Sequence, residues 1–525
     1  MNGLDPQVSY RALRTRDTRF DGRLFVGVTS TGIYCRPVCP AATPKFENCL
    51  FFRSAAAAQE AGFRPCLRCR PETAPDVGSW RGTSNTVSRG LALIAAGELD
   101  GDEASVDGLA ERLGVGARQL RRLFNEHLGA SPVAMAQTRR VLFAKQLVHE
   151  TRLPMAEIAV ASGFGSVRRF NETFQHLFHR PPTDLRRKRA TPLLEGTIAE
   201  TGVTLRLRYR PPYDWGSVLA HLRARAIDGV ERAGDDEYAR TVLEGGHPST
   251  VTVAHLPECQ SLAATIRSRS VRVLPAIVAR VRRLFDLGAD VAGIGEHLSG
   301  DPLLAPLVAA RPGLRIPGSW DGFELAVRAI LGQQVTVHAA RRLVERLARL
   351  CGTPMPLGQS TEPGLTLLFP TAAQVARADL AELAVPEARR RALIAMADAA
   401  QADPRLFDPL ETVEKTVARL RTIRGVGDWT AHYIALRAGG EPDAFPSSDL
   451  GLLRAAGAGG SRPTPAELHA RAERWRPWRA YAAQHLWTAD AASRSSLVQG
   501  PANECPAGGE APRRQGARRA HSEPM

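Results

Sequence analysis

Four cysteines near the start of the chain have the spacing of a metal site. They form two close pairs, Cys35-Arg-Pro-Val-Cys39 and Cys66-Leu-Arg-Cys69, with 26 residues between the pairs. Two such pairs can close a tetrahedral set of thiolates, which suits Zn²⁺ because four soft sulfurs match its size and its lack of geometric demand. Most sites of this kind are structural, so zinc that only holds a small domain together is the alternative to a reactive centre. The other cysteines have no partner pattern and are expected to pack or to lie at the surface: Cys49, Cys259, Cys351 and Cys505.

A second candidate centre lies in the last third of the chain. The segment from Leu420 to Ala431 contains Gly425-Val-Gly427, a spacing that allows a tight hairpin whose backbone N–H groups hold a DNA phosphate. Downstream, Asp449 follows Phe445-Pro-Ser-Ser. A carboxylate there either caps a helix or stabilises positive charge in a reaction, and the residues alone leave both interpretations open.

Two helix-turn-helix patterns lie between these centres. One runs from Leu109 to Phe124 and the other from Ile158 to Phe174, and each has a small residue, a turn glycine and an amphipathic second helix. A plain helical hairpin is the alternative, but two copies with basic second helices favour DNA binding. The positions expected to face DNA are Arg118, Gln119, Arg121, Ser166, Arg168 and Arg169.

The charge of the chain points to the same class of partner. The 525 residues carry a net charge of +15, and residues 1–190 supply two thirds of it. Such an excess predicts a polyanionic partner, nucleic acid before a membrane. No run of about 18 apolar residues or apolar leader occurs, so we expect no membrane partner and a cytoplasmic protein that is associated with the cell's DNA.

The segments Phe25–Cys39 and Ala61–Pro71 resemble the N-terminal domain of the Ada family, the methyl-accepting sensors of the bacterial response to alkylation. The resemblance implies one zinc ion, structural and activating, bound by Cys35, Cys39, Cys66 and Cys69. It implies that Cys35 also accepts a methyl group from a methylphosphotriester in DNA, and that the methylated protein regulates transcription. Thr31 and Arg64 fall at positions that contact DNA in the family. A zinc-bound sulfur stays a thiolate, the nucleophilic form, and its thioether product makes the domain a single-turnover reagent.

The later segments resemble two further families. The helix-turn-helix units, with Gly163-Phe-Gly-Ser and the Pro181-Pro182 ending, resemble the AraC family. Residues 197–490 resemble the 3-methyladenine DNA glycosylase II (AlkA) family of the helix-hairpin-helix superfamily, on the strength of Arg328–Val335, the hairpin and Trp475–Trp487. This implies a catalytic Asp449, a base pocket of Trp429, Tyr433 and Trp487, and DNA contacts by Gly425 and Gly427. In that family a leucine acts as a wedge that fills the space left by the flipped base. Gln334 stands at the matching position, which leaves the mode of duplex opening undecided.

The implied reaction is hydrolysis of the N-glycosidic bond of a 3-methyladenine-type purine. A carboxylate beside the sugar stabilises an oxocarbenium-like state, and a cationic base stacks well on aromatic faces after it is flipped out. Trp429 occupies the place of the Schiff-base lysine of bifunctional relatives, so a monofunctional glycosylase is predicted. No cysteine cluster follows the hairpin, so no iron–sulfur cluster is expected.

The expected fold is a multidomain α+β chain. Strands are predicted within 197–209, 238–243 and 250–256, and helices from Leu274 to about Ala492. The expected units are a small zinc domain (1–78), an all-α double helix-turn-helix domain (85–190), a β-containing AlkA-like N-terminal subdomain (197–305), an all-α helix-hairpin-helix glycosylase (306–490) and a disordered tail (491–525).

Three functions remain open at this stage. The first is a repair enzyme that is also a methylation-activated transcription regulator, with alkylated double-stranded DNA, promoter DNA and RNA polymerase as partners. The second is a glycosylase whose N-terminal half only tethers it to DNA. The third is a regulator with an inactive glycosylase half, which the retention of Asp449 argues against.

Overall fold

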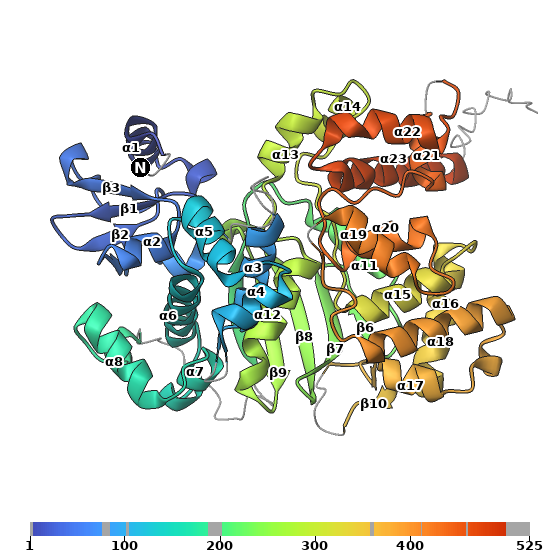
Figure 1. The fold of residues 1–525 in the computed structure, drawn as a ribbon, viewed down its shortest axis with the longest axis horizontal. Coiled ribbons are helices and arrows are strands. Elements are labelled where there is room, and N and C mark those ends of the chain that lie inside the picture. Colours follow the sequence, from blue (N-terminus) through green and yellow to red (C-terminus); the bar gives the residue numbers. More distant parts are fainter. Residues whose placement is uncertain are drawn as a thin grey trace, which may run out of the picture.

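The computed structural model describes seven stretches of the chain: 4–75, 85–100, 104–186, 202–356, 362–410, 412–457 and 460–499. In Figure 1 the blue N-terminal elements lie on one side of a green sheet, and the yellow to red helices lie on the other. The predicted multidomain α+β class is confirmed. Within the described stretches, no helix has both the length and the apolar character that crossing a bilayer requires.

The zinc domain is a small sheet with helices against it. Its strand order is β3-β1-β2-β4, in which β2 and β4 are parallel and the other neighbours antiparallel. Asp5 begins the first helix by accepting N–H groups of its first turn. The elements are α1 (Pro6–Arg14), β1 (Phe25–Val28), β2 (Ile33–Cys35), β3 (Cys49–Phe52), α2 (Ala55–Glu60) and β4 (Arg64–Pro65).

The helix-turn-helix domain contains two units of the same design. In each unit's second helix every fourth residue is buried, Leu120, Phe124 and Leu128 in one and Phe170, Phe174 and Phe178 in the other. This spacing gives each helix one apolar face and leaves the opposite face to solvent. The helices are α3 (Asn85–Ala96), α4 (Val106–Arg112), α5 (Ala117–Leu128), α6 (Pro132–Glu150), α7 (Met155–Ala161), α8 (Val167–Phe178) and α9 (Pro182–Leu185).

A five-stranded antiparallel sheet follows, in the order β5-β9-β8-β7-β6. The three predicted strands are found as β5, β7 and β8, although the part of the first prediction before residue 202 lies outside the described residues. Strands β6 and β9 had not been predicted. The elements are β5 (Val203–Arg208), α11 (Trp215–Arg223), β6 (Glu231–Ala233), β7 (Glu237–Glu244), β8 (His247–Leu256), β9 (Ser261–Ser268) and α12 (Leu274–Leu284).

The C-terminal half is helical, apart from one pair of two-residue strands in the described part. Its hydrophobic core also includes residues of α13 and α14. The expected domain boundary at 305/306 had placed α13 in the sheet-containing unit, whereas α13 packs with the helical half. The elements are α13 (Val291–Leu298), α14 (Ala305–Ala310), α15 (Gly322–Leu331), α16 (Val337–Cys351), β10 (Thr353–Pro354), β11 (Leu367–Leu368), α17 (Ala372–Arg377), α18 (Glu387–Ala402), α19 (Val413–Arg421), α20 (Asp428–Arg437), α21 (Leu450–Ala456), α22 (Pro465–Ala472) and α23 (Arg479–Gln499).

The last helix corrects one boundary. Residues 491–499, expected to begin a disordered tail, are the final turns of α23. The sequence has no proline or glycine in these turns, whereas Gly500 and Pro501 follow them directly in the sequence. The rest of the predicted tail, 500–525, lies outside the described residues.

The two halves of the chain are in direct contact. Helices α6 to α8 contribute to the same hydrophobic core as the large sheet. The Gln146 side chain on α6 donates to the Arg206 carbonyl of β5 at 3.0 Å, and the Arg112 guanidinium of α4 lies 2.9 Å from the Asp408 carboxylate. The four-cysteine domain, the helix-turn-helix helices and the C-terminal half with its five-stranded sheet are therefore packed together.

Candidate functional site

The four paired cysteines converge at the ends of β2 and β4. Their sulfurs all lie within 4.8 Å of one another. Strand β2 ends at Cys35, and β4 leads into Cys66, whose N–H donates to the Tyr34 carbonyl at 3.0 Å. Cys35 is half-buried, whereas Cys39, Cys66 and Cys69 are buried. The spacing predicted from sequence is thus realised as one compact donor set in which Cys35 is the least buried residue.

The surroundings of the sulfurs fit a divalent cation. Backbone N–H groups of Arg36 and Arg68 donate to the sulfurs of Cys69 and Cys66, at 3.4 and 3.3 Å. Hydrogen bonding to Cys39 raises the pKa of Cys35, and hydrogen bonding to Cys35 lowers the pKa of Cys66. Four crowded sulfurs therefore cannot all ionise by themselves, and Zn²⁺ is the ion whose charge and tetrahedral preference allow it.

The positions expected to touch DNA lie beside this centre. Thr31 is exposed in the turn between β1 and β2, and Arg64 is half-buried in β4. The Arg64 N–H donates to the Gly32 carbonyl at 2.9 Å, so the two residues flank the same turn. Both strands continue from there into zinc-site cysteines, and a DNA strand held at this turn would pass close to Cys35.

A buried ion pair ties the cysteine centre to the helix-turn-helix domain. Lys145 of α6 has no exposed surface, and its ammonium donates to the Cys66 carbonyl at 3.0 Å and to the Glu72 carboxylate at 2.7 Å. Burial alone would raise the pKa of Glu72, but Lys145 and Arg70 outweigh it and leave that pKa lowered. Sequence reasoning missed Lys145, whose only signal was a lysine among the apolar residues of a long helix.

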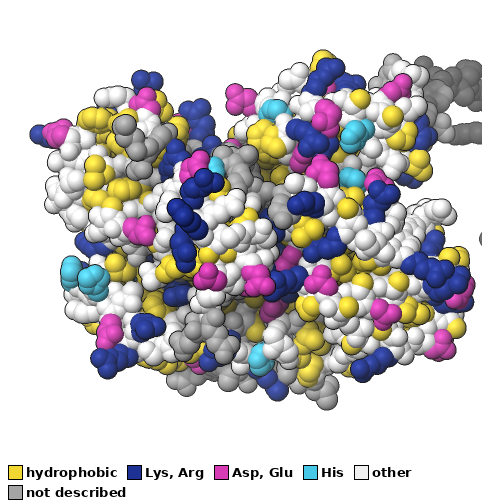
Figure 2. Space-filling model, viewed as in Figure 1, with side chains coloured by type: hydrophobic (Ala, Val, Ile, Leu, Met, Phe, Trp, Pro, Cys, Tyr) yellow, Lys and Arg dark blue, Asp and Glu magenta, His cyan; other side chains and the backbone are white. Residues whose placement is uncertain are grey.

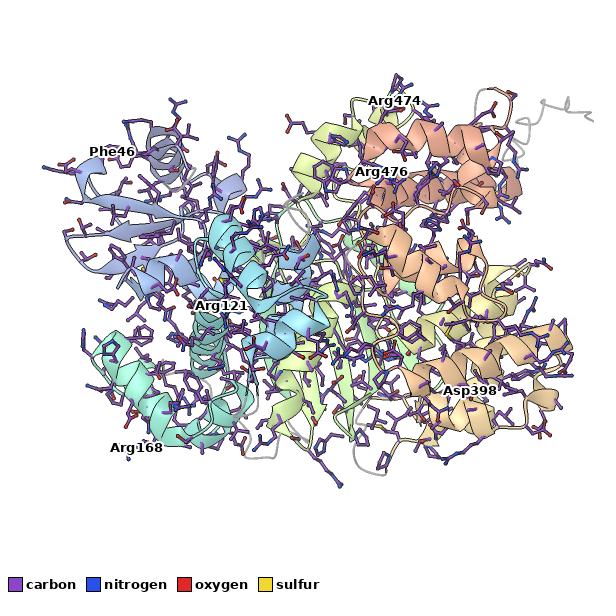
Figure 3. All side chains as sticks on the ribbon, in the orientation of Figure 1. Phe46, Arg121, Arg168, Asp398, Arg474 and Arg476 are labelled. Carbon is purple, nitrogen blue, oxygen red and sulfur yellow. The ribbon has the colours of Figure 1, made fainter. Side chains whose placement is uncertain are left out.

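The expected DNA-facing residues of the helix-turn-helix units are on exposed helix surfaces. Arg118, Gln119 and Arg121 lie on α5, and Arg168 and Arg169 lie on α8, all of them exposed. Ser166 is also exposed and caps α8 by accepting the Arg169 N–H. Figure 3 labels one arginine on each helix, Arg121 on α5 and Arg168 on α8. Figure 2 shows Lys and Arg side chains, interspersed with Asp and Glu, across the face of the molecule that is in view.

Asp449 lies at the start of α21 and is held by four N–H donors. The indole N–H of Trp429 donates to Oδ2 at 2.7 Å, and that of Trp487 donates to Oδ1 at 2.9 Å. The backbone N–H groups of Gly451 and Leu452 donate to Oδ1 at 2.8 and 3.0 Å. Asp449 is thus a helix cap and is also joined to two aromatic residues, so the two sequence interpretations are compatible. Its half-buried carboxylate is fixed in direction while Oδ2 keeps capacity for another partner.

The three predicted pocket aromatics lie together around that carboxylate. The rings of Trp429 and Tyr433 stack with centroids 5.1 Å apart, and Trp487 meets Tyr433 edge-on at 6.2 Å. The buried Arg437 guanidinium lies 5.2 Å from the Tyr433 ring centre and 5.3 Å from that of Trp487. Burial opposes ionisation of Tyr433, but Arg437 and Arg225 outweigh it and lower its pKa. Arg437 was missed, although it continues the four-residue spacing of Trp429 and Tyr433 on α20.

The glycine hairpin packs on α18, and Gln334 lies in an exposed loop. Gly425 has φ of +86°, and a Cβ there would lie 2.3 Å from the Ala392 Cβ of α18, so glycine is required. Gly427 caps α20 in open space. Gln334 is exposed in the loop between α15 and α16 with φ of +58°, a left-handed conformation that non-glycine residues rarely adopt.

Four family models match successive parts of the chain: the metal-binding domain of Ada (8–72), a helix-turn-helix domain (109–188), the AlkA N-terminal domain (204–321) and the HhH-GPD superfamily of base excision DNA repair proteins (327–480). Over 131 residues the chain is 31% identical to the bifunctional transcriptional activator/DNA repair enzyme Ada of Escherichia coli, covering 25% of this chain and 35% of that protein.

Longer matches cover the glycosylase half and then nearly the whole chain. DNA-3-methyladenine glycosylase 2 of Escherichia coli is 38% identical over 284 residues, which cover 54% of this chain and 95% of that protein. A probable bifunctional transcriptional activator/DNA repair enzyme AlkA of Mycobacterium tuberculosis is 40% identical over 479 residues, which cover 91% of this chain and 95% of that protein. The chain therefore belongs to the family of bifunctional transcriptional activators and DNA repair enzymes that join an Ada-type sensor to an AlkA-type glycosylase.

Proposed function

We propose that this protein repairs alkylated DNA by two separate reactions and regulates transcription in response to the damage. The glycosylase half hydrolyses the N-glycosidic bond of 3-methyladenine-type purines, and Cys35 accepts methyl groups from methylphosphotriesters. The observation that carries the proposal is the setting of Asp449, whose carboxylate is fixed by Trp429 and Trp487 within a group of aromatic rings.

Base excision follows from this arrangement. Alkylation at N3 or N7 makes the purine cationic, so it stacks favourably on indole and phenol faces and leaves as a neutral base. As the glycosidic bond breaks, positive charge develops on the sugar, and a carboxylate already oriented by four donors stabilises that charge without reorganising. Water then adds to the sugar carbon and releases a proton to solvent.

We infer a monofunctional glycosylase. The Schiff-base position after the hairpin is Trp429, and Lys415, the one lysine beyond position 188, lies in the first turn of α19, at the opposite end of that helix from the hairpin. No amine is thereby available from the hairpin to cleave the DNA backbone. The three catalytic-site aromatics and Gly425 and Gly427 retain their proposed roles in base and phosphate binding.

Methyl acceptance is assigned to Cys35 on the strength of the likeness to Ada-type domains, and Cys35 is also the least buried residue of the four. Zn²⁺ bound by Cys35, Cys39, Cys66 and Cys69 would keep the sulfur as a thiolate at neutral pH. N–H donors to the sulfurs of Cys66 and Cys69 weaken their nucleophilicity, and among the described residues no such backbone donor reaches Cys35. The Cys35 sulfur attacks the methyl carbon, a sulfur–carbon bond forms, and the carbon–oxygen bond breaks to leave a phosphodiester anion. Thr31 and Arg64 would hold the DNA strand at this centre.

Regulation is assigned to the exposed faces of α5 and α8, through Arg118, Gln119, Arg121, Ser166, Arg168 and Arg169. Methylation removes one negative charge from the sulfur cluster, which strengthens binding to DNA phosphates within a Debye length of about 8 Å. Promoter DNA and RNA polymerase are then the proposed partners. In the alternative function, the N-terminal half only tethers the enzyme to DNA and does not regulate transcription. The packing of this half against the sheet is compatible with both functions.

Base release from methylated duplex DNA tests the glycosylase proposal. Asp449→Asn keeps a side chain of the same size and removes the charge, so excision should fall by about 100-fold or more. Asp379→Asn is the matched control, because Asp379 also caps a helix by accepting an N–H (from Ala381, 3.0 Å) but lies in another segment. Equal rates for the wild type and Asp449→Asn would remove Asp449 from the mechanism.

The regulatory proposal has its own test. Reporter transcription after alkylation should be induced by the wild type and not by Cys35→Ala, whereas both proteins should excise bases alike. No induction by the wild type would favour the tethering function, and induction by Cys35→Ala would remove methylation of Cys35 from the regulation.

A further inference from the structure

Gln333 connects two DNA-binding features that come from different parts of the sequence. It lies in the loop after α15, immediately before the wedge position Gln334. Its side-chain amide donates to the Gly425 carbonyl in the hairpin at 3.1 Å and to the Thr430 hydroxyl in α20 at 3.2 Å. Thr430 is buried and Gln333 is half-buried, so the hydrogen bond between them is partly buried.

Helix α18 completes the connection. The Arg389 guanidinium donates to the Gln333 carbonyl at 2.8 Å, and Gly425 packs directly on Ala392. Arg389 and Ala392 are three residues apart and therefore share one face of α18. The wedge loop and the hairpin are thus docked side by side on one helix, with the Gln333 amide bridging them.

Gln334 needs such support. Its backbone is in the left-handed region, a strained conformation for a residue other than glycine. Its side chain is exposed and makes no hydrogen bond among the described residues, so nothing beyond the backbone orients it. The neighbouring Gln333, which is bonded at both its amide and its carbonyl, is the residue that can hold this conformation.

We propose that Gln333 is a positioning residue that fixes the distance between the hairpin, which holds the DNA backbone, and the Gln334 tip, which fills the space left by the flipped base. The inference rests on the proposed glycosylase function and extends it to how the duplex is opened. Gln333 does not touch the reacting atoms. Its loss should impair base flipping and leave bond cleavage, which depends on Asp449, unchanged.

The test compares two duplexes that differ in the cost of flipping. Both contain 7-methylguanine, paired with cytosine in one and mispaired with adenine in the other, because an unpaired base is easier to extrude. Gln333→Met keeps the side-chain length and removes the donors. We expect single-turnover excision from the paired site to fall about tenfold, since complete loss of two hydrogen bonds of about 1 kcal/mol each would give about 30-fold at most, and from the mispaired site less than threefold. Gln401→Met is the control, because the Gln401 amide bonds only within α18 (Ala397 carbonyl, 3.4 Å).

A second readout does not depend on bond cleavage. The fluorescence of 2-aminopurine next to the target site rises on unstacking, and this rise should be smaller with Gln333→Met than with the wild type. Thr430→Val, which removes one acceptor and keeps the shape, should give the same pattern at about threefold and serves if Gln333→Met does not fold. Equal losses on the two duplexes, or no loss on the paired one, would overturn the inference alone. A wild type that releases no base from either duplex would overturn the proposed function, and the inference with it.

Discussion

The cysteine centre and the aspartate centre each hold an anionic group in a fixed position, but they do so differently. The first would supply a nucleophile, and the second would stabilise positive charge. The four sulfurs are brought together by strand ends and loops and lie within 4.8 Å of one another, so four thiolates there would repel each other. The Asp449 carboxylate is held by N–H donors from α20, α21 and α23. The first centre therefore needs a cation to become reactive, whereas the second is complete in the polypeptide.

Metal removal should give the largest difference. Treatment with a chelator should abolish methyl uptake by Cys35, because the sulfurs lose the charge that keeps them ionised. Base excision should change by less than about threefold, since Asp449 is held by indole and backbone N–H groups and by no group of the metal site. Zinc content, methyl transfer and base release are measured on the same sample. Excision lost in parallel with zinc would contradict the independence of the two centres.

Lys145→Met should destabilise the sensor end of the molecule. It leaves the buried Glu72 carboxylate with Arg70 as its remaining cation, and breaking a buried pair of this kind costs about 3–5 kcal/mol. Lys45→Met, at an exposed lysine, should change the free energy of unfolding by less than about 0.5 kcal/mol. Denaturant unfolding measures both. Similar small changes in the two variants would mean that the sensor is not anchored on α6.

The stability of the glycosylase half should depend on pH through one buried carboxylate, Asp286. Burial raises the pKa of Asp286 to about 6, above its ordinary value of 3.8, with Tyr481 of α23 and the Ile316 N–H as donors. A folded-state pKa above the unfolded value means that its stabilising contribution is complete below about pH 4 and is lost as the pH rises to about 6. Relative to Asp286→Asn, the wild type should lose up to about 3 kcal/mol across this window. The measurement is the free energy of unfolding of both proteins at each pH. A constant difference between the wild type and Asp286→Asn from pH 4 to 7 would contradict the raised pKa.

Trp487→Phe should have the smallest effect of the four. It keeps an aromatic ring against Tyr433 and removes one of the four donors to Asp449. Excision should fall about tenfold, the cost of one hydrogen bond to a charged group. Trp478→Phe, whose ring packs against His297, is the matched control. A loss as large as that of Asp449→Asn would mean that the indole does more than orient the carboxylate.

Much of this organisation could be predicted from sequence because it depends on local spacing. The cysteine pairs, the glycine hairpin and the alternation of Val203, Leu205 and Leu207 each specify a short structure by themselves. Strand β9 was overlooked although Leu262, Ala264 and Ile266 alternate in the same way, because alanine is a weak signal for a buried strand position.

The missed residues act across long sequence separations. Gln333 meets Gly425 only after α15, α18 and α20 have packed, and Lys145 meets Glu72 across two domains. Nothing in the neighbouring residues marks a glutamine or a lysine as the partner of a group so far away in the chain. The tail boundary was misplaced because a composition average over residues 491–525 hid the helix-compatible stretch before Gly500.

One crossed measurement tests the central claim that the chain holds two independent alkyl-repair centres. Cys35→Ser and Asp449→Asn are each incubated with methylated duplex DNA, and protein methylation is followed by mass spectrometry while released bases are quantified. The account predicts that Cys35→Ser gains no methyl group at position 35 and still releases 3-methyladenine, and that Asp449→Asn gains one methyl group and releases about 100-fold less base. Loss of both activities in either variant, or full base release by Asp449→Asn, would contradict it.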